Sequence, residues 1–600
     1  MLASSKPRGY ESSDNTFYPM VILGAGMGGI GMACQLKDKL GFDQFRLFER
    51  QSGIGGTWWI NRYPGVACDI PAIFYSFSFH QNPNWSSFFP SGEEILRYQQ
   101  SIVEKYQLID KIQLNSDVVH CQWDDFRNEW EITVRHLVPG MGDLSAAERQ
   151  KRANLEGPAS VYISSETVRC KVLLSAVGGL VEPRGWPSDV VGHDKFQGEI
   201  FHSARWNENI NLFGKNILVV GTGCSAAQIV PKLLAEKGVK KVTQVMREAP
   251  WVVPRLTPPL GDESWNKLAP KIFSTIPGLM NLIRKIVAIQ IDATFAYFGA
   301  SESSQQARDR LRDDLLAHLR KTAPKKYHQI LTPSYDVGCK RRIFDTDWFP
   351  SLSDPRLELT TLGLKSVNST AAILAPSRKT HPSEAQMDER EIPCDVIILA
   401  NGFEVSSWFH PLMVVGLDGK SLNSVFDKRG GPQMYKGTAL DGFPNFFALF
   451  GPNSFSGHSS VILGLENQIT HALQLIRPLL QNDISKINLK AEAALSYNQE
   501  IQAALKNMVW NSGGCSSWYL SSRGHNSVNY PYSMLWQSWT CLYPTWSHWN
   551  ISWTLQGRRK RNVRVFRRLA LLITISYLFF YTRGNHLLAL LKNRESWKSY

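Results

Sequence analysis

The chain has 600 residues, of which 43% are hydrophobic and 20% charged, and a formal net charge of +14. This length exceeds what one hydrophobic core supports, and the apolar content excludes a largely disordered protein, so two or three globular domains are expected. Residues 558–600 hold eleven Lys or Arg and one acid, whereas residues 1–557 hold 55 basic and 51 acidic residues. The basicity therefore belongs to the C-terminal tail, and no nucleic-acid partner is indicated.

The nine cysteines are scattered along the chain without a C-x-x-C pair. This arrangement predicts neither a zinc site nor a redox dithiol, so no metal site is expected. Reduced thiols and a cytoplasmic location are the simplest interpretation.

A short apolar strand at 20–23 runs into a G-x-G-x-x-G turn formed by Gly24, Gly26 and Gly29, followed by a helical pattern. The next strand ends at Glu49, twenty residues after Gly29. Such glycines let the backbone approach a pyrophosphate at a helix N-terminus, and the carboxylate accepts hydrogen bonds from ribose hydroxyls. This unit predicts a site for FAD or NAD.

The pattern repeats after the strand 216–220, with Gly221, Gly223 and Ala226 in the turn. The following strand ends on Arg247 instead of an acid. An arginine at this place suits a 2′-phosphate, so the second unit predicts NADPH, although the neighbouring Glu248 would repel that phosphate.

Other segments define the organisation. Residues 265–321 are helix-rich but interrupted by charges, which indicates a globular insert, and the buried-strand pattern at 394–403 is expected to return to the first domain's sheet. The fold class is α/β, with two Rossmann-like dinucleotide-binding domains, the second inserted in the first. The expected boundaries are 1–150 and 391–545 for an FAD-binding domain, 151–390 for an NADP-binding domain with a linker at 195–210 and a helical insert at 265–330, and 546–600 for a tail.

The linker carries F-x-G-x-x-x-H-x-x-x-W, as Phe196, Gly198, His202 and Trp206. With "GGTWWINRYPGVACD" at 55–69, it resembles the two signatures of Baeyer–Villiger monooxygenases.

Two further segments, 338–349 and 513–526, are similar to that family's G-x-K-R segment and to its late cofactor-covering loop. The resemblance extends over about 18–540, and segments 55–75 and 338–349 most resemble enzymes that tailor fungal polyketides and terpenoids.

The resemblance implies that NADPH reduces FAD, that reduced flavin activates O2, and that one oxygen atom enters beside the carbonyl of a hydrophobic ketone to give an ester or lactone. Carried over by motif, Arg341 would stabilise the negative charge that develops, and Asp69 would hold its guanidinium. Arg342 lies next to Arg341, so the assignment can shift by one residue, and a merely structural ion pair is the alternative.

The resemblance also implies the remaining site residues. Phe196, Gly198, His202 and Trp206 would couple domain motion to nicotinamide occupancy. The residues implied for FAD are Gly24, Gly26, Gly29, Glu49, Thr57, Trp58, Trp59, Ile60, Asp69, Ile70 and Tyr75. Those implied for NADP are Ala67, Cys68, Asp69, Thr222, Gly223, Cys224, Ser225, Ala226, Ala227, Gln228, Arg247, Glu248 and Trp518.

Two other functions stay open, an N- or S-oxygenating flavoenzyme and a membrane-associated flavoprotein that oxygenates nothing. The tail bears on the second, since the basic run 558–568 precedes thirteen uncharged residues, 569–581. A helix of that length covers about 20 Å, short of the roughly 30 Å hydrocarbon core. Three interpretations of the tail therefore stay open: attachment to a membrane through 558–591, a helix docked on the body, and a disordered extension. The sequence makes no prediction of the oligomeric state.

Overall fold

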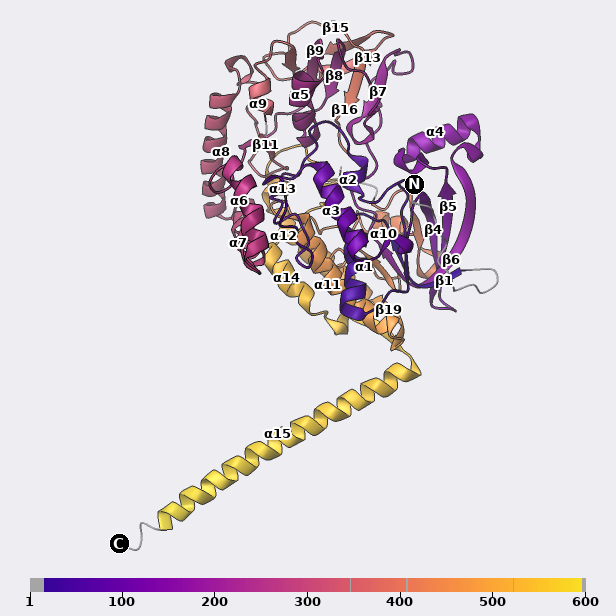
Figure 1. The fold of residues 1–600 in the computed structure, drawn as a ribbon, viewed down its shortest axis with the longest axis vertical. Helices are drawn as coiled ribbons and strands as arrows, with labels where there is room; N and C mark the ends of the chain where they lie inside the picture. Colours follow the sequence, from indigo (N-terminus) through magenta and orange to yellow (C-terminus); the bar gives the residue numbers. More distant parts are fainter. Residues whose placement is uncertain (1–15, 346, 406–407, 522, 596–600) are drawn as a thin grey trace.

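The computed structural model describes residues 16–345, 347–405, 408–521 and 523–595. The body contains two domains, one built on a mixed sheet and one on a parallel sheet, and one long helix projects from it (Figure 1). The outermost residues of the expected first domain and tail, 1–15 and 596–600, lie outside the described residues.

The first sheet has eight strands among the described residues, in the order β17-β4-β5-β6-β1-β2-β3, with β18 paired to β6. Strand β1 (Thr16–Leu23) is parallel to both of its neighbours, β2 (Phe45–Phe48) and β6 (Tyr162–Ser175). The second half of β1 is completely buried, since α1 (Met27–Leu40) and α11 (Val461–Leu480) share its core. The other strands are β3 (Ile112–Gln113), β4 (Ser116–Asp124), β5 (Glu129–Leu137), β17 (Met413–Val415) and β18 (Phe446–Ala448).

The second sheet is parallel, in the order β12-β9-β8-β16-β7. Helix α5 (Cys224–Glu236) follows β8 and packs its apolar face into this domain's core. The strands are β7 (Glu199–His202), β8 (Asn216–Val220), β9 (Lys241–Val245), β12 (Leu357–Thr360) and β16 (Val396–Leu399).

Two domain boundaries differ from the sequence expectation. Strand β16, expected in the first sheet, pairs with β7 and β8, so the strand at 394–403 belongs to the second domain. Strand β6 belongs to the first sheet, although 151–390 was assigned to the second domain. Both errors have one physical cause: an apolar run predicts a buried strand, but not which sheet supplies its neighbours.

The expected helical insert contains α6 (Asp262–Thr275), α7 (Leu279–Ala293) and α8 (Glu302–Thr322), which run along one edge of both domains (Figure 1). Buried Arg284 of α7 makes an ion pair of 2.8 Å with Glu466 of α11, which fastens the insert to the first domain.

Short elements complete the body. The helices are α2 (Thr57–Ile60), α3 (Gly92–Lys105), α4 (Ala146–Glu156), α9 (Trp348–Ser351), α10 (Leu422–Lys428), α12 (Ala491–Lys506), α13 (Val509–Ser512) and α14 (Met534–Leu542). The strands are β10 (Val252–Pro254), β11 (Ile343–Asp345), β13 (Gly363–Val367), β14 (Ala371–Ala375), β15 (Arg390–Pro393), β19 (Ile484–Leu489) and β20 (Trp549–Trp553).

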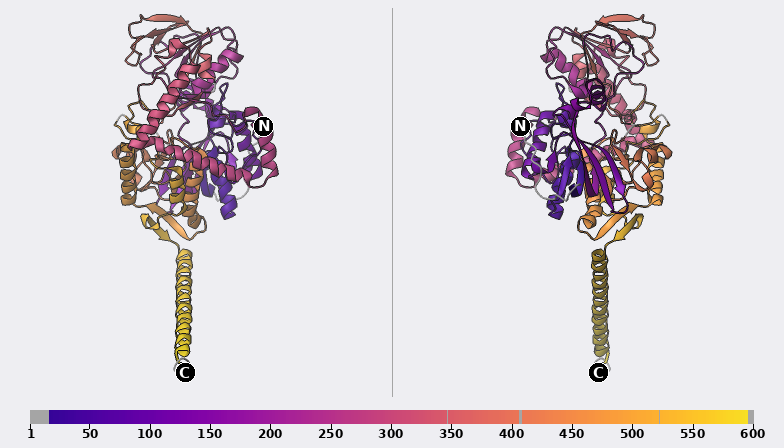
Figure 2. Two further views of the ribbon diagram at one scale, coloured as in Figure 1. Left: turned by 90° about the vertical axis from the view of Figure 1, so that its left-hand side faces the viewer. Right: turned by 90° about the vertical axis from the view of Figure 1, so that its right-hand side faces the viewer.

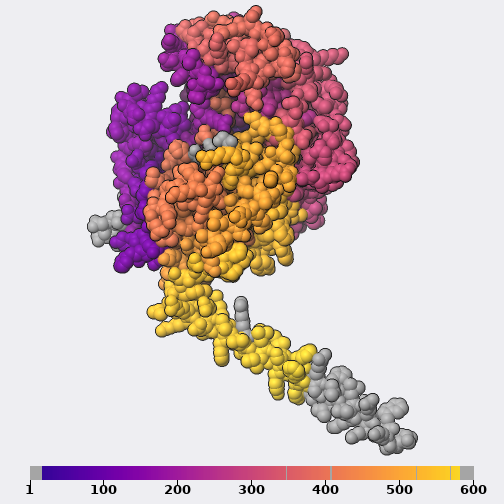
Figure 3. Space-filling model, turned by 180° about the vertical axis from the view of Figure 1, so that it is seen from behind, coloured from indigo at the N-terminus to yellow at the C-terminus, as the bar shows by residue number. Residues whose placement is uncertain are grey.

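The tail begins later than expected, because β20 pairs with β19 and so extends the body to Trp553. From there α15 (Leu555–Glu595) is a single helix that leaves the body as a rod (Figures 2 and 3). Its base is fixed by an ion pair of 2.7 Å between Lys560 and Asp483. Among the described residues, no helix combines the length and the apolarity needed to cross a membrane.

The expectation that all cysteines are reduced is wrong for two of them. Cys339 and Cys515 form a disulfide, whereas all nine thiols were expected to be reduced. The two residues lie 176 positions apart, and the fold brings the loop before Arg341 against the loop before Trp518. Sequence spacing could not show this meeting of two distant loops.

Candidate active site

A cavity of about 1720 Å³ lies where the two sheet domains meet. Its wall includes both glycine-rich turns, the segment after Gly55 and the loop that carries Arg341. Pockets for one small molecule usually measure about 300–1000 Å³, so this cavity has room for more than one ligand.

The first glycine-rich turn lies between β1 and α1. A Cβ on Gly26 would come within 3.4 Å of the Cα of Gly56, so the turn and the segment 55–60 approach backbone to backbone. Helix α1 has Gly26 as N-cap, without a side-chain cap or an acid in its first turn. The N–H groups at this end thus remain for an anionic ligand. Gly29 lies outside the cavity lining; its Cβ would fall 1.9 Å from the carbonyl oxygen of Gly24, so it serves the tight packing of the turn.

Glu49 follows β2 and is buried at the cavity wall. Its carboxylate accepts hydrogen bonds from the backbone N–H of Ala25 at 2.6 Å and of Gln51 at 2.9 Å. Burial raises the pKa of Glu49, and these two donors oppose that shift. The carboxylate is thereby held rigidly beside the first turn.

The second turn opens at Gly223, the N-cap of α5, where a Cβ would meet no atom within 4 Å. The adjoining residues reach across to the first domain. Gln228 donates from Nε2 to the carbonyl oxygen of Ala67 at 3.1 Å and accepts from the Tyr63 hydroxyl at 2.9 Å. The second turn is thus joined to the segment 55–69.

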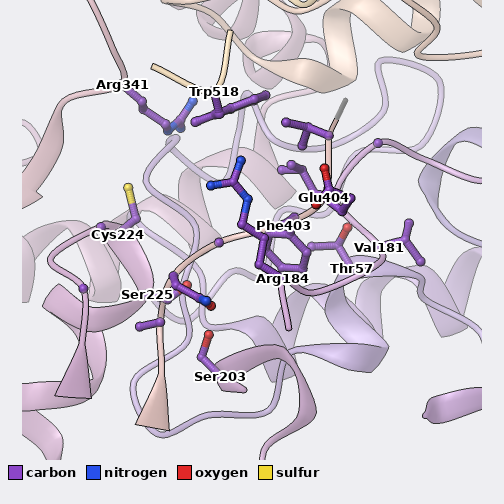
Figure 4. Close-up of a pocket in the computed structure, with 18 of the residues that line it drawn as sticks. Thr57, Val181, Arg184, Ser203, Cys224, Ser225, Arg341, Phe403, Glu404 and Trp518 are labelled. Carbon is purple, nitrogen blue, oxygen red and sulfur yellow. The ribbon is translucent and has the colours of Figure 1, made fainter. Parts of the chain in front are cut away.

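Asp69 and Arg341 form a bidentate ion pair at the cavity wall. Nη2 of Arg341 donates to Oδ1 and Oδ2 of Asp69, both at 2.6 Å, and Nε donates to Oδ2 at 3.2 Å. The carboxylate raises the pKa of Arg341, which stays protonated. The Arg341 side chain is nevertheless 41% exposed, and it lies beside Trp518 and near Cys224 (Figure 4).

Arg341 and Arg342 differ in their placement. Arg342 is outside the cavity lining, and burial lowers its pKa, while Tyr297 and Tyr519 favour its charged form. Of these two arginines, Arg341 is the one that lines the cavity.

The linker residues lie behind the cavity, not in its lining. His202 ends β7, donates from Nε2 to the carbonyl oxygen of Gly402 at 2.9 Å, and accepts at Nδ1 from the N–H of Ala204. Burial lowers the pKa of His202 to about 4, so its ring is neutral at pH 7. Trp206 packs edge-on against Phe201, with ring centroids 5.1 Å apart.

The spacing of Phe196 and Gly198 has a steric explanation. A Cβ on Gly198 would fall 2.2 Å from the carbonyl oxygen of Asp395 and 2.6 Å from the Phe196 ring. Phe196 itself packs against the core on one face of the second sheet. The linker is thus pressed onto β16 of that domain.

A basic cluster surrounds the end of β9. Arg247 and Glu248 line the cavity there, together with Lys340 and Lys379. Lys340 makes an ion pair with Glu248, which offsets the negative charge expected to repel a phosphate. Burial lowers the pKa of Lys340, although the Glu248 carboxylate opposes this shift. Sequence reasoning missed Lys340 and Lys379, because their loops are distant from β9 in the chain.

Other residues complete the comparison with the sequence expectation. Trp59 points away from the cavity, with its Nε1 donating to Asp143 at 3.0 Å, and Ala226 and Ala227 are buried in the core of the second domain. Sequence reasoning missed Arg184, which points into the cavity (Figure 4) and follows β6, at the carboxyl end of a parallel strand where ligands usually bind. The expected residues that do line the cavity are Gly24, Gly26, Glu49, Thr57, Trp58, Ile60, Ala67, Cys68, Asp69, Ile70, Tyr75, Thr222, Gly223, Cys224, Ser225, Gln228, Arg247, Glu248, Arg341 and Trp518.

Comparison with known proteins assigns the family. The model of the NAD(P)-binding Rossmann-like domain matches residues 22–90, and that of flavin-binding monooxygenase-like proteins matches 170–276. A Baeyer–Villiger monooxygenase of Pseudomonas aeruginosa is 31% identical over 85% of this chain and 87% of its own length. A Baeyer–Villiger monooxygenase of Streptomyces coelicolor is 31% identical over 85% of this chain and 88% of its own length. The chain belongs to the Baeyer–Villiger monooxygenase family.

The enzyme is therefore an FAD-dependent monooxygenase that uses NADPH. It is also 30% identical to the FAD-binding monooxygenase ktnD of Aspergillus niger, over 86% of this chain and 79% of that protein. Cyclohexanone monooxygenase from Rhodococcus sp. Phi1, bound to NADP⁺, shares its fold, with a TM-score of 0.70 and 21% identity over 90% of this chain and 100% of the other.

The cavity of this monooxygenase fits two dinucleotides. Each glycine-rich turn presents an uncapped helix N-terminus, and the space beside Gly223 is one that a side chain would fill. A pyrophosphate needs this combination of close backbone approach and free N–H donors.

Proposed function

We propose that the first turn and Glu49 hold FAD, that the second turn holds NADPH with its 2′-phosphate at Arg247, and that Asp69 and Arg341 form the catalytic pair. The observation that carries the proposal is the bidentate ion pair in the wall of a cavity shared by both turns. Lys340 supports the placement of the phosphate, because it offsets the charge of Glu248 beside Arg247.

FAD, when bound, would supply the redox chemistry, which is acceptance of a hydride from NADPH and activation of oxygen. The task of Arg341 is to donate N–H groups to oxygen atoms that gain negative charge as the ketone carbonyl is attacked. Asp69 holds the guanidinium in one orientation, so no reorganisation is needed during the reaction. A lysine would lack the planar fork that this bidentate contact requires.

The linker residues act through position, not proton transfer. His202 hydrogen-bonds β7 to the segment after β16, and Phe196 and Trp206 pack within the second domain. We assign them the coupling of this domain's movement to nicotinamide occupancy. The neutral, doubly hydrogen-bonded ring of His202 supports this role.

The substrate we propose is a hydrophobic ketone of polyketide or terpenoid type, an intermediate of secondary metabolism. Trp518, next to Arg341, packs edge-on against Phe455, with the two ring centroids 6.3 Å apart. Phe409 and Leu412 also line the cavity, so this part of its wall is apolar. An apolar wall beside the cation favours a bulky, nonpolar ketone. The similarity to ktnD, a fungal protein, is consistent with this class.

Two neighbouring arginine variants test the function. Arg341→Ala should lower formation of the ester or lactone about 100- to 1000-fold, the usual effect of losing one preorganised donor, while bound FAD is retained. Arg342→Ala, the matched control, should stay within a few-fold of the wild type because Arg342 is outside the cavity lining. Equal losses in both variants, or turnover of thioethers or amines in preference to every ketone, would reject the assignment.

A further inference from the structure

The projecting helix α15 exposes an apolar segment to solvent. Residues 569–581 carry no charge, and within them Leu571 is 60%, Ile573 68% and Phe580 70% exposed. The exposed side chains point in every direction around the helix, since they include consecutive positions such as 571–573 and 577–581. A helix that is apolar on all sides is buried in its functional state.

The charge before this segment selects the partner. Seven Lys or Arg occur in 558–568, and the first acid of α15 is Glu595. Lys560 pairs with Asp483 at the base of the helix, whereas Arg558, Arg559 and Arg567 are exposed. A cation-rich stretch followed by an apolar one matches an anionic headgroup layer above acyl chains.

A second exposed surface lies at the same end of the body. On α14 and just after it, Trp539 is 62% and Tyr543 72% exposed, with Trp536 and Trp546 also exposed. These residues precede β20, which leads directly into α15, and α14 lies at the end of the body from which the helix projects (Figure 1). Tryptophan and tyrosine are the side chains typical of the membrane–water interface.

This surface is built firmly into the fold. Asp292, the one acidic residue of α7, accepts hydrogen bonds from the backbone N–H of Met534 at 2.7 Å and of Leu535 at 3.1 Å, which fixes the start of α14. Helix α7 adds exposed Leu282, Ile286 and Ile289, which recur at helical spacing. Helix α7, which is in contact with α14, thus carries further exposed apolar side chains.

We propose that this enzyme docks on an anionic lipid bilayer through α15 and the aromatic surface of α14. The segment 569–581 enters the acyl chains of one leaflet, and the basic segment 558–568 lies among the headgroups. Thirteen helical residues cover about 20 Å, short of the roughly 30 Å core, so the segment does not span the bilayer. The helix lies along one interface, which leaves the cations on both sides of the apolar segment, 558–568 and Arg583, at the headgroups. A second copy of the chain fits less well, because parallel helices would place two basic segments side by side.

The test uses the full-length protein with FAD bound and flotation with lipid vesicles. It should float with vesicles that contain phosphatidylserine and much less with pure phosphatidylcholine, and high salt should weaken the binding. Absence of flotation with either lipid would overturn the proposal. The proposal would also be overturned if the protein were a dimer in lipid-free buffer and if substitutions in the tail, described below, dissociated that dimer.

Charge-reversal variants locate the contact. Reversing three exposed tail arginines should weaken partitioning onto phosphatidylserine vesicles at least about 100-fold, whereas a matched reversal on the second domain should leave it unchanged. Both variants should keep the FAD content and ketone turnover of the wild type, which shows that they fold. Equal binding of the tail variant and the control variant to the vesicles would contradict the proposal. Trp539→Ala should weaken binding to the vesicles to the same extent at low and at high salt. The tail variant is R558E/R559E/R567E, and the control is K215E/K237E/K240E.

Discussion

Asp69→Asn isolates the contribution of the carboxylate to the orientation of Arg341. Three contacts of 2.6, 2.6 and 3.2 Å hold the guanidinium, and an amide can replace only part of them, because its NH₂ group faces donors. Arg341 remains charged in this variant, so the loss is one of position. At an effective dielectric constant of about 20 and without screening, the Coulomb attraction between the Asp69 carboxylate and the Arg341 guanidinium is about 4 kcal/mol.

Solvent reduces that figure, since the Arg341 side chain is 41% exposed. We therefore take about 1.5–3 kcal/mol, the range for hydrogen bonds to charged groups, which corresponds to a rate loss of about 10- to 150-fold. The assay measures ester or lactone formed per NADPH consumed with one ketone at saturating NADPH and oxygen. The expected result is slow product formation and a lower ratio of product to NADPH.

The matched control is Asp189→Asn, an exposed carboxylate that lines the same cavity. It should behave like the wild type. If Asp69→Asn retains FAD and forms product within about threefold of the wild-type rate, the proposed role of the ion pair is wrong.

Three further predictions concern other parts of the molecule. Lys340→Ala leaves the charge of Glu248 uncompensated, so KM should rise about 10- to 100-fold for NADPH and little for NADH; an equal rise for both would refute the phosphate placement. Alkylation of the denatured, unreduced protein should modify seven of the nine cysteines, and nine by mass spectrometry would disprove the Cys339–Cys515 bond. With a folded pKa of about 4 against about 6.5 unfolded, His202 should lower the free energy of unfolding by up to about 3 kcal/mol as the pH falls from 6.5 to 4. The thermal midpoint of His202→Gln should lack this decline, and unchanged pH dependence would argue against a buried neutral ring.

The sequence places several local parts of the candidate site at the cavity. Both glycine-rich turns, Asp69 and Arg341 lie at the cavity as expected, because each motif encodes a backbone geometry or a charge needed at one place. Trp59 shows the limit of such transfer, since it adjoins Trp58 in the motif but faces Asp143 instead of the cavity.

Long-range pairings could not be predicted. The neighbours of β16, the ion pair of Lys340 with Glu248 and the disulfide of Cys339 with Cys515 each join segments far apart in the chain. A periodicity or a spacing describes one segment at a time, whereas these contacts depend on how the two sheets stack.

The most direct test of the account is oxygen transfer from ¹⁸O₂, with a bulky ketone and a thioether offered in separate reactions with NADPH. We predict an ester or lactone that carries one ¹⁸O atom, formed faster than any sulfoxide and lost in Arg341→Ala. NADPH consumption without labelled ester, or faster labelling of the thioether, would contradict the assignment of Asp69 and Arg341 as the centre of a Baeyer–Villiger reaction.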